Sequence, residues 1–250
     1  MPRIITLLTD FGTADGYVGE MKGVLAARAP DCAVVDIAHD IAAHDVESGR
    51  LALARYWRRF PAGTVHVVIV DPRVGGPRAA LAVESEGRYL VGPDNGVLSA
   101  ALLHPGAQCV ALPVPSSASP TFHGRDVFAP AAAQLGDGVA LDSLGIPFSE
   151  PIVMRTPEAT KLAEGVTAGT VIAIDRFGNV ITNLVGWRGG TVEVAGRILS
   201  IAHTYSDVPS GASVAVIGSS GLVEIAVRDG CAAAVLNLSR GDEVILRHQS

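Results

Sequence analysis

The pattern of apolar residues changes at a proline-rich segment, and this change constrains the fold more than any other feature of the sequence. Before residue 147, short apolar runs alternate with stretches in which apolar residues recur at helical spacing. After residue 161, short apolar runs follow one another roughly every ten residues, with Gly, Asn and Asp between them. The first pattern is typical of a mostly parallel sheet covered by helices, and the second of a small antiparallel barrel or sandwich.

We therefore predict an α/β protein with an N-terminal α/β domain over residues 1–150 and a C-terminal β-barrel domain over residues 165–250, joined by a linker at about 151–164. The expected N-terminal strands are Arg3–Thr9, Ala33–Ile37, Thr64–Val70, Ala79–Glu84, Arg88–Val91 and Gln108–Leu112, and the expected helices are Asp15–Arg28, Asp45–Phe60 and Ala129–Leu135. The expected C-terminal strands are Gly169–Ile174, Val180–Leu184, Thr191–Val194, Ile198–Ile201, Ser213–Ile217, Leu222–Ala226, Ala232–Leu236 and Glu243–Leu246. We expect Asp15 and Asp45 to cap the helices that they begin.

Composition excludes several classes of protein. An apolar fraction of 48% in 250 residues is ample for a buried core, and a net charge of −6 argues against a nucleic-acid binder. No apolar run approaches a membrane span, and the start MPRIITLLTDFG meets a charge and a glycine too early for a signal peptide. The three cysteines are far apart and form no CxxC pair, which argues against a disulfide framework or a zinc site. We expect a cytoplasmic protein with reduced thiols, no membrane contact and no nucleic-acid partner.

The segment DPRVGGPR, residues 71–78, lies between two predicted strands. A carboxylate, Asp71, ends the first strand, and a guanidinium, Arg78, begins the second. The intervening turn would let these two groups pair at a sheet edge, where open α/β sheets bind ligands. Hairpin turns also carry Asp and Gly for local reasons, so the segment alone leaves the two interpretations equal.

Two further N-terminal turns carry polar groups. In TDFG, Asp10 ends the first predicted strand, where a carboxylate can hold the two hydroxyls of a ribose or cap a helix. The segment lacks the GxGxxG spacing of a pyrophosphate cradle. In GPDNG, residues 92–96, each residue suits a tight turn, so turn chemistry is the better explanation there.

The segment TFHGRDVF places His123 just before a predicted helix. Imidazole titrates near neutrality, so His123 can accept a proton from a weakly acidic nucleophile. A single histidine is more often structural than catalytic, and His39 and His44, in the loop after a strand, could also face a ligand.

Three C-terminal segments offer ligand-binding groups. The turn DRFGN could hold a zwitterion and a flat ring, or be an ordinary hairpin tip. The segment GSSGLVEIA offers hydroxyls and amides suited to a carboxylate, and it places Glu224 in a strand. Tyr205 could stack on a purine, although an isolated loop tyrosine is ordinary.

Taken together, these segments resemble one family. Over Ile4 to Ala233, the chain is similar to the S-adenosyl-L-methionine hydroxide adenosyltransferases, the hydrolytic relatives of fluorinase and chlorinase. Each motif is weak alone, but six occur in register: TDFG, DPxVGxxR, PDNG, FHGRD, DxFGNxxTN and SSGxxEIA.

The resemblance implies hydrolysis of S-adenosyl-L-methionine to adenosine and L-methionine. It also implies a homotrimer, with sites between the N-terminal domain of one subunit and the C-terminal domain of the next. The implied water-activating residues are Asp71, Arg78 and His123. The implied substrate-binding residues are Asp10 at the ribose, Asp175 and Ser219 at the methionine end, Asn179 and Phe177 at the adenine with Tyr205 over it, and Glu224.

This chemistry needs no general acid, because the sulfonium leaves as a neutral thioether. Water is a poor nucleophile, so the difficult step is its activation. A guanidinium can favour hydroxide, and a histidine can accept the proton. Asp71 would orient both groups, and neither a metal nor a cofactor is expected.

The sequence departs from the family pattern at Arg73, where the family usually has glycine, so a second guanidinium either alters the site or points outward. Halogenase relatives place hydroxyl side chains where this chain has Val74 and Gly124, and they lack the aspartate at position 71. Both differences favour water over halide. The alternatives are a halogenase that forms a 5′-halo-adenosine and a non-catalytic module that binds adenosine or S-adenosyl-L-methionine.

Overall fold

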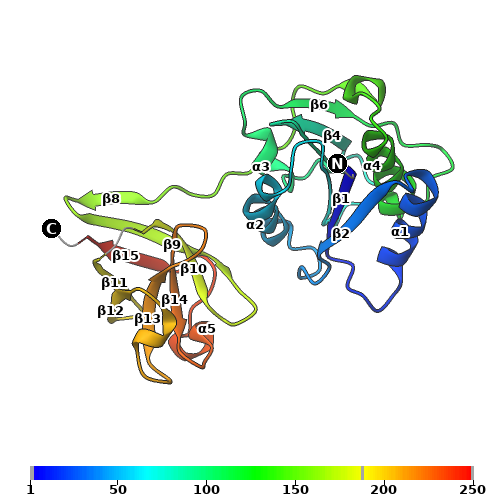
Figure 1. Cartoon of the computed structure of the whole chain (residues 1–250). Helices are drawn as coiled ribbons and strands as arrows, with labels where there is room; N and C mark the ends of the chain where they lie inside the picture. Colours follow the sequence, from blue (N-terminus) through cyan, green and yellow to red (C-terminus); the bar gives the residue numbers. More distant parts are fainter. Residues whose placement is uncertain (1–2, 187–188, 249–250) are drawn as a thin grey trace. The chain divides into compact units, whose positions relative to one another are not determined.

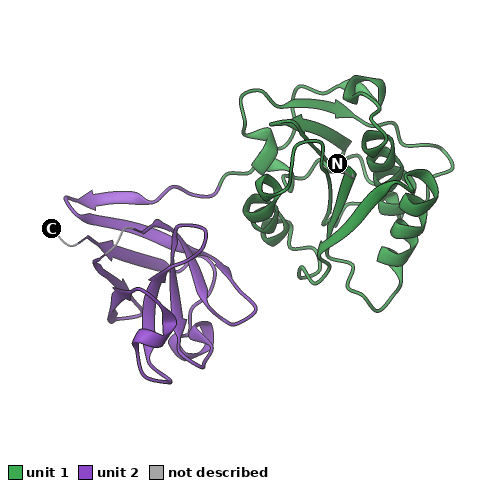
Figure 2. Cartoon of the chain, viewed as in Figure 1, with its two compact units in different colours: residues 1–155 green, residues 156–250 purple. Residues whose placement is uncertain are grey.

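The computed structural model of the chain describes residues 3–186 and 189–248. The chain folds into two compact units, Met1–Arg155 and Thr156–Ser250 (Figures 1 and 2). The first unit contains a mixed sheet with helices, and the second contains a barrel.

The sheet of the first unit has the order β2-β1-β3-β5-β4-β6-β7. Its strands are β1 Arg3–Thr9, β2 Cys32–Ala38, β3 Val65–Ile69, β4 Ala80–Ser85, β5 Arg88–Pro93, β6 Gln108–Ala111 and β7 Ile146–Pro147. Strands β2, β1, β3 and β5 run parallel, whereas β4 pairs antiparallel with β5 and β6, and β6 with β7. The predicted α/β sheet is confirmed, and its parallel part consists of β2, β1, β3 and β5, with β4, β6 and β7 added as antiparallel strands.

Helices cover both faces of this sheet (Figure 1). Helices α1 (Tyr17–Arg28) and α4 (Ala129–Gly136) pack on one face, and α2 (Val46–Tyr56) and α3 (Ser99–Leu102) on the other. Short helical turns η1 (Trp57–Arg59), η2 (Gly124–Phe128) and η3 (Leu141–Ser143) complete the unit. All five residues of β3 are buried, with Val67 in the α1–α4 core and Val68 in the opposite core. Continuous apolar runs of this kind follow from a sheet covered on both faces.

The two predicted helix caps have different outcomes. Asp45 caps α2, since its Oδ1 accepts a bond from the Ser48 amide at 3.0 Å. The prediction for Asp15 is wrong: α1 begins at Tyr17, and Gly16 is the N-cap with a left-handed φ of 80° and no side-chain cap bond. Glycine adopts this conformation without a steric penalty, so the chain turns there and leaves Asp15 outside the cap.

The second unit is a closed barrel. Its strands are β8 Thr160–Ala163, β9 Val166–Ile174, β10 Val180–Val185, β11 Thr191–Val194, β12 Arg197–Ala202, β13 Ser213–Ile217, β14 Leu222–Val227 and β15 Glu243–Arg247. Their order is β10-β14-β13-β12-β11-β15-β9-β8, and a further pairing of β9 with β10 closes the barrel. The pairings are antiparallel except for β12 with β13. A short turn η4 (Tyr205–Asp207) and helix α5 (Ala232–Leu236) lie in the connections.

One predicted strand of this unit is wrong, and one strand was not predicted. The run Ala232–Leu236 is helix α5 and not a strand, with Ala232 and Leu236 buried one helical turn apart. Short apolar runs do not distinguish strand from helix by periodicity, and alanine favours helix. Strand β8 lies inside the predicted linker; all four of its residues are exposed, so only its pairing with β9 makes it a strand.

Candidate active site

One edge of the first unit's sheet collects the predicted N-terminal site residues. Strands β1 and β3 are parallel neighbours, so Asp10 after β1 and Asp71 after β3 lie at the same edge. The amide of Asp10 donates to the Ile69 carbonyl at 3.3 Å, which fixes the two strand ends together. Because β4 runs antiparallel to β5, its first residues lie at this edge too, and Arg78 comes just before them.

The turn over residues 71–78 is not a hairpin. Strand β5 lies between β3 and β4, so the turn crosses the end of β5 and brings Arg78 back to Asp71. The Arg78 Nε donates to Asp71 Oδ1 at 3.1 Å, and its Nη2 donates to Asp71 Oδ2. The two side chains are only 5% and 4% exposed, so this bidentate pair is shielded from water and charge-assisted.

His123 joins this pair from a segment far along the chain. It precedes η2, and its Nδ1 lies 3.0 Å from Arg78 Nη2. A guanidinium can only donate, so Nδ1 is the acceptor and the ring is neutral with its hydrogen on Nε2. Burial and the Arg78 charge lower the pKa of His123 below its usual value, although the carboxylates of Asp71 and Asp126 oppose the shift. The ring is therefore held as a base rather than as a cation.

Two close approaches hold these segments in place. Gly75 has a φ of +73°, and a Cβ there would lie 2.2 Å from the carbonyl oxygen of Pro120, three residues before His123. Only glycine allows the turn and the histidine segment to touch. Asn95 also contacts the residue before Asp71: its Nδ2 donates to the Val70 carbonyl at 2.8 Å. Its Oδ1 accepts from the Val97 amide at 3.1 Å. The turn interpretation of GPDNG is confirmed for Asn95.

Asp10 lies against the loop that carries the two histidines left open above. Its Oδ2 accepts a bond from the His44 amide at 2.9 Å, and His44 has a left-handed φ of 68°. His39 is buried, with its Nδ1 2.9 Å from Thr9 Oγ1. Both histidines therefore lie at the end of β1, where His44 contacts the Asp10 carboxylate and His39 the Thr9 hydroxyl.

The sequence interpretation missed a second carboxylate near Arg78. Asp94 is buried, its amide donates to the Ala79 carbonyl at 3.0 Å, and its Oδ1 accepts from the Ile152 amide at 2.7 Å. Burial raises the pKa of Asp94, and the Arg78 charge partly offsets the rise. The good fit of PDNG to a turn concealed this residue. Arg73, by contrast, is exposed.

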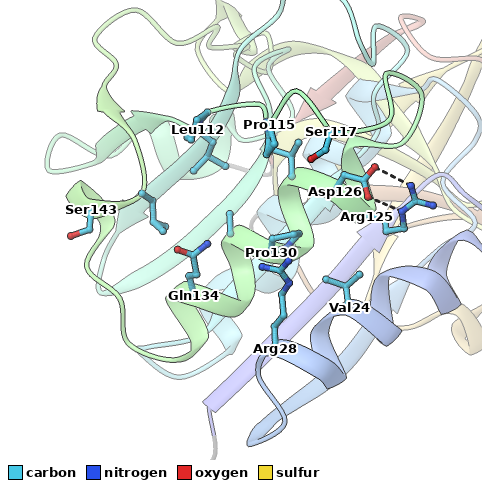
Figure 3. A pocket seen from close by; sticks show the side chains of 15 residues that line it. Val24, Arg28, Leu112, Pro115, Ser117, Arg125, Asp126, Pro130, Gln134 and Ser143 are labelled. Atoms are coloured by element: carbon cyan, nitrogen blue, oxygen red, sulfur yellow. Dashed lines mark hydrogen bonds and ion pairs between the residues drawn. The ribbon is translucent and has the colours of Figure 1, made fainter.

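Two residues that follow His123 line a separate cavity. Arg125 and Asp126 form two side-chain bonds of 2.7 and 2.9 Å, and they line a cavity of about 550 Å³ together with Arg28 of α1 and Gln134 of α4 (Figure 3). None of the three residues Asp71, Arg78 and His123 lines this cavity. The cavity is therefore distinct from the candidate active site.

In the second unit, Asp175, Phe177 and Asn179 lie in the turn that joins β9 to β10. Asp175 Oδ1 accepts from the amides of Phe177 and Asn179 at 2.9 and 2.8 Å, and its Oδ2 accepts from Asn179 Nδ2 at 3.0 Å. These bonds are those of a well-formed hairpin tip. Phe177 is 77% exposed, which turn chemistry does not explain.

The other predicted residues of the second unit lie around β14. Glu224 is 5% exposed, and its Oε2 accepts from the hydroxyl of Tyr205 at 3.0 Å. Ser219 is exposed in the turn before β14. Since Val180 pairs with Ile225 and Val185 with Leu222, Ser219 and the β9–β10 tip lie toward opposite ends of this strand pair. The structure does not bring Asp175 and Ser219 into one turn.

Three properties of the described residues bear on other kinds of site. Over residues 3–186 and 189–248, no helix is long and apolar enough to cross a membrane. In the same residues, no group of three His, Cys, Asp or Glu side chains is arranged to hold a metal ion. Cys32, Cys109 and Cys231 are free thiols.

Sequence families match both units. Residues 5–145 match the SAM hydroxide adenosyltransferase N-terminal domain, and residues 169–245 match the C-terminal domain of the same name. Together the two matches cover most of the chain, including every candidate site residue.

Individual relatives agree with the family matches. The chain is 44% identical to a protein from Thermus thermophilus named (R)-S-adenosyl-L-methionine hydrolase, over 98% of this chain and 99% of that protein. It is 39% identical to a protein of the same name from Salinispora arenicola, over 96% of each. A fluorinase from Actinopolyspora mzabensis is 29% identical, also over 96% of each.

Two solved structures share the fold. A conserved hypothetical protein from Thermus thermophilus is 42% identical with a TM-score of 0.83, over 98% of this chain and 99% of that one. An uncharacterized conserved protein from Thermotoga maritima is 32% identical with a TM-score of 0.88, over 98% of this chain and all of that one.

Proposed function

Because the chain belongs to the SAM hydroxide adenosyltransferase family, we propose that it is an S-adenosyl-L-methionine hydrolase that produces adenosine and L-methionine. The single observation that carries the proposal is the contact of Arg78 with both Asp71 and His123 at a sheet edge. The names of the relatives specify the (R) configuration at sulfur, and we extend that preference to this chain.

In the proposed reaction, a water molecule attacks the ribose C5′ in line with the departing sulfur. The C5′–S bond breaks, its electron pair neutralises the sulfonium, and methionine leaves as a thioether. The water must lose a proton, and His123 is the proposed acceptor because its ring is neutral and its pKa lies below the usual value. The proton goes to Nδ1, so the contact with Arg78 must open as water binds.

Arg78 has the role of an electrostatic stabiliser. Its charge lies in a site shielded from solvent, where it favours negative charge on the attacking oxygen. Asp71 holds the guanidinium in a fixed plane through two bonds and offsets part of its charge. No cofactor enters the reaction, and we expect full activity after dialysis against a chelator.

The substrate-binding residues extend the proposal. Asp10 would hold the ribose hydroxyls with a carboxylate already oriented by the His44 amide. Phe177 and Asn179 would contact the adenine, with Tyr205 packed over it. Asp175 and Ser219 would bind the methionine end. Glu224 would orient Tyr205. A ligand that reaches both Asp175 and Ser219 has to extend along the β10–β14 pair, because these residues lie toward its opposite ends.

A homotrimer with each site shared between two subunits is also part of the proposal. Its test is complementation between two inactive variants, His123→Asn and Phe177→Ala, mixed after partial unfolding and refolding together. Sites that combine one subunit's first unit with another's second unit would regain activity in the mixture. Unchanged inactivity, or a monomeric mass by ultracentrifugation, would rule the arrangement out. We also propose a cytoplasmic location, which cell fractionation tests.

The direct test of the activity is incubation of purified protein with a mixture of the (R) and (S) epimers. Chromatography is expected to show adenosine and methionine formed while the (R) epimer disappears. Added fluoride or chloride tests the halogenase alternative, which the 29% identity to a fluorinase motivates. The loss of hydroxyl side chains at Val74 and Gly124 favours adenosine as the sole product. Calorimetric binding without product would instead indicate a binding module.

A further inference from the structure

Three aromatic rings form a cluster beside His123 that has no role in the proposal above. Phe11 follows Asp10, Phe122 precedes His123, and Tyr17 begins α1. The ring centroids are 6.0 Å apart for Phe11 and Tyr17, 6.0 Å for Phe11 and Phe122, and 5.2 Å for Tyr17 and Phe122, all edge to face. The cluster therefore bridges the residue proposed to hold the ribose and the residue proposed to accept the proton.

The three rings are unequally accessible. Phe122 is 8% exposed, and the guanidinium of Arg125 lies over its ring at 5.0 Å from the centroid. Arg125 is itself bonded to Asp126, as Figure 3 shows, so it is a fixed support. Tyr17 is 46% exposed and Phe11 is half-buried, so these two rings keep surface available to a ligand.

Gly124 permits this arrangement. A Cβ at Gly124 would lie 3.3 Å from a ring carbon of Phe11 and 3.3 Å from the sulfur of Met21. These distances are tighter than ordinary packing, so a Cβ at this position would require Phe11 or Met21 to shift by a few tenths of an ångström. The glycine thus brings an aromatic ring next to the reaction site.

The substrate of the proposed reaction supplies a reason for the rings. S-adenosyl-L-methionine has a permanent positive charge on the sulfur bonded to C5′, between the ribose and the methionine chain. With the ribose at Asp10 and the attacking water at His123, the sulfonium lies in the region that the rings border. A ring face attracts a cation. It is not a nucleophile, so it cannot compete with water as a carboxylate could.

We propose that Phe11 and Tyr17 bind the sulfonium group of the substrate through their ring faces. The proposal rests on the proposed function, since it concerns the same substrate. As the C5′–S bond breaks, the electron pair goes to sulfur and the cation disappears, while the water proton goes to His123. The attraction is therefore strongest before the reaction, so it lowers KM and does not raise kcat.

The test compares two analogues that differ in charge at one position. S-adenosyl-L-homocysteine has a neutral thioether in place of the sulfonium, and sinefungin has a protonated amine there. Calorimetry on the wild-type protein is expected to show tighter binding of the cationic analogue. Tyr17→Leu and Phe11→Leu keep apolar surface but remove the ring, so they should reduce this preference about 2- to 30-fold. Tyr17→Phe keeps the ring and should retain the preference.

The same variants have a kinetic signature. Tyr17→Leu should raise KM for S-adenosyl-L-methionine while kcat stays equal or rises. An unchanged preference for the cationic analogue in both leucine variants would overturn the proposal, even with activity intact. If the wild-type protein bound neither analogue, the proposed function itself would fail. Tyr17 is the more exposed ring, so its variant keeps the test available if Phe11→Leu does not fold.

Discussion

Nη2 of Arg78 lies 3.0 Å from Nδ1 of His123, although 45 residues separate the two in the sequence. Because the guanidinium is also bonded to Asp71, one cation sits between a carboxylate and an imidazole with little exposure to solvent. In this contact the neutral His123 ring accepts a hydrogen bond from the positively charged Arg78 through Nδ1.

Replacing His123 by asparagine tests its role as a base. Asparagine can still accept a bond from Arg78, so the local structure should survive, but it cannot take a proton at neutral pH. We expect kcat to fall about 100- to 10,000-fold with an unchanged melting temperature. His203→Asn is the matched control, since His203 is exposed in the second unit and should tolerate the change. Near-normal turnover by His123→Asn would remove the histidine from the mechanism.

The pH dependence of kcat/KM should show one acidic limb. A base works only when neutral, and burial together with Arg78 lowers the pKa of His123, so the midpoint should lie below pH 6.5. The carboxylate of Asp71 raises this pKa, so Asp71→Asn should move the midpoint to still lower pH while it reduces activity. Asp142→Asn, at an exposed carboxylate, should leave the midpoint in place. A limb that did not move in Asp71→Asn would show that another group titrates.

Gly75→Ala tests the contact between the turn and the histidine segment. Its Cβ would collide with the Pro120 carbonyl at 2.2 Å, so the segment that carries His123 must move. We expect kcat/KM to fall at least tenfold, roughly the effect of a misplaced catalytic group. Gly63→Ala has the same left-handed backbone, with φ of +82°, but nothing within 4 Å of the new carbon. Equal losses in the two variants would mean that backbone strain, and not the collision, is responsible.

His66 should make the stability of the first unit depend on pH. It lies fully buried on β3, and burial, with a smaller effect of Arg88, lowers its pKa from 6.5 to about 4. The unfolded chain therefore binds the proton more readily. The neutral ring contributes its full stability above pH 6.5, and this contribution is lost as pH falls toward 4, by about 3 kcal/mol for one such group.

Urea unfolding of the wild-type protein and of His66→Gln at pH 7 and pH 4 measures this contribution. Between pH 7 and pH 4, the free energy of unfolding should fall more in the wild-type protein than in His66→Gln, because glutamine does not titrate. An equal fall in the two proteins would show that His66 is not the group responsible.

The sequence predicts the parts of this fold and site that depend on local pattern. The apolar runs that form β1 and β3 can be recognised in the sequence, because strands covered on both faces need continuous apolar residues. The pairing of Asp71 with Arg78 follows from a short turn, although the insertion of β5 between their strands is a property of the whole sheet.

Other features depend on tertiary contacts that no local pattern carries. The contact of His123 with Arg78 depends on the fit of Gly75 against Pro120, and Asp94 is concealed within a sequence that suits a turn. The sequence of helix α5 favours a strand equally well, because five apolar residues fit both periods. The aromatic cluster of Phe11, Tyr17 and Phe122 joins three segments and could not be recognised before the fold was known.

Activation of a water molecule for attack on the ribose carbon is the step on which the proposed reaction depends. The most direct measurement is the reaction of S-adenosyl-L-methionine in water enriched in oxygen-18, followed by mass spectrometry of both products. We predict one heavy oxygen in the 5′-hydroxyl of adenosine and none in methionine, with labelled adenosine formed about 100- to 10,000-fold more slowly in His123→Asn. Adenosine without the label, or no adenosine at all, would contradict the claim.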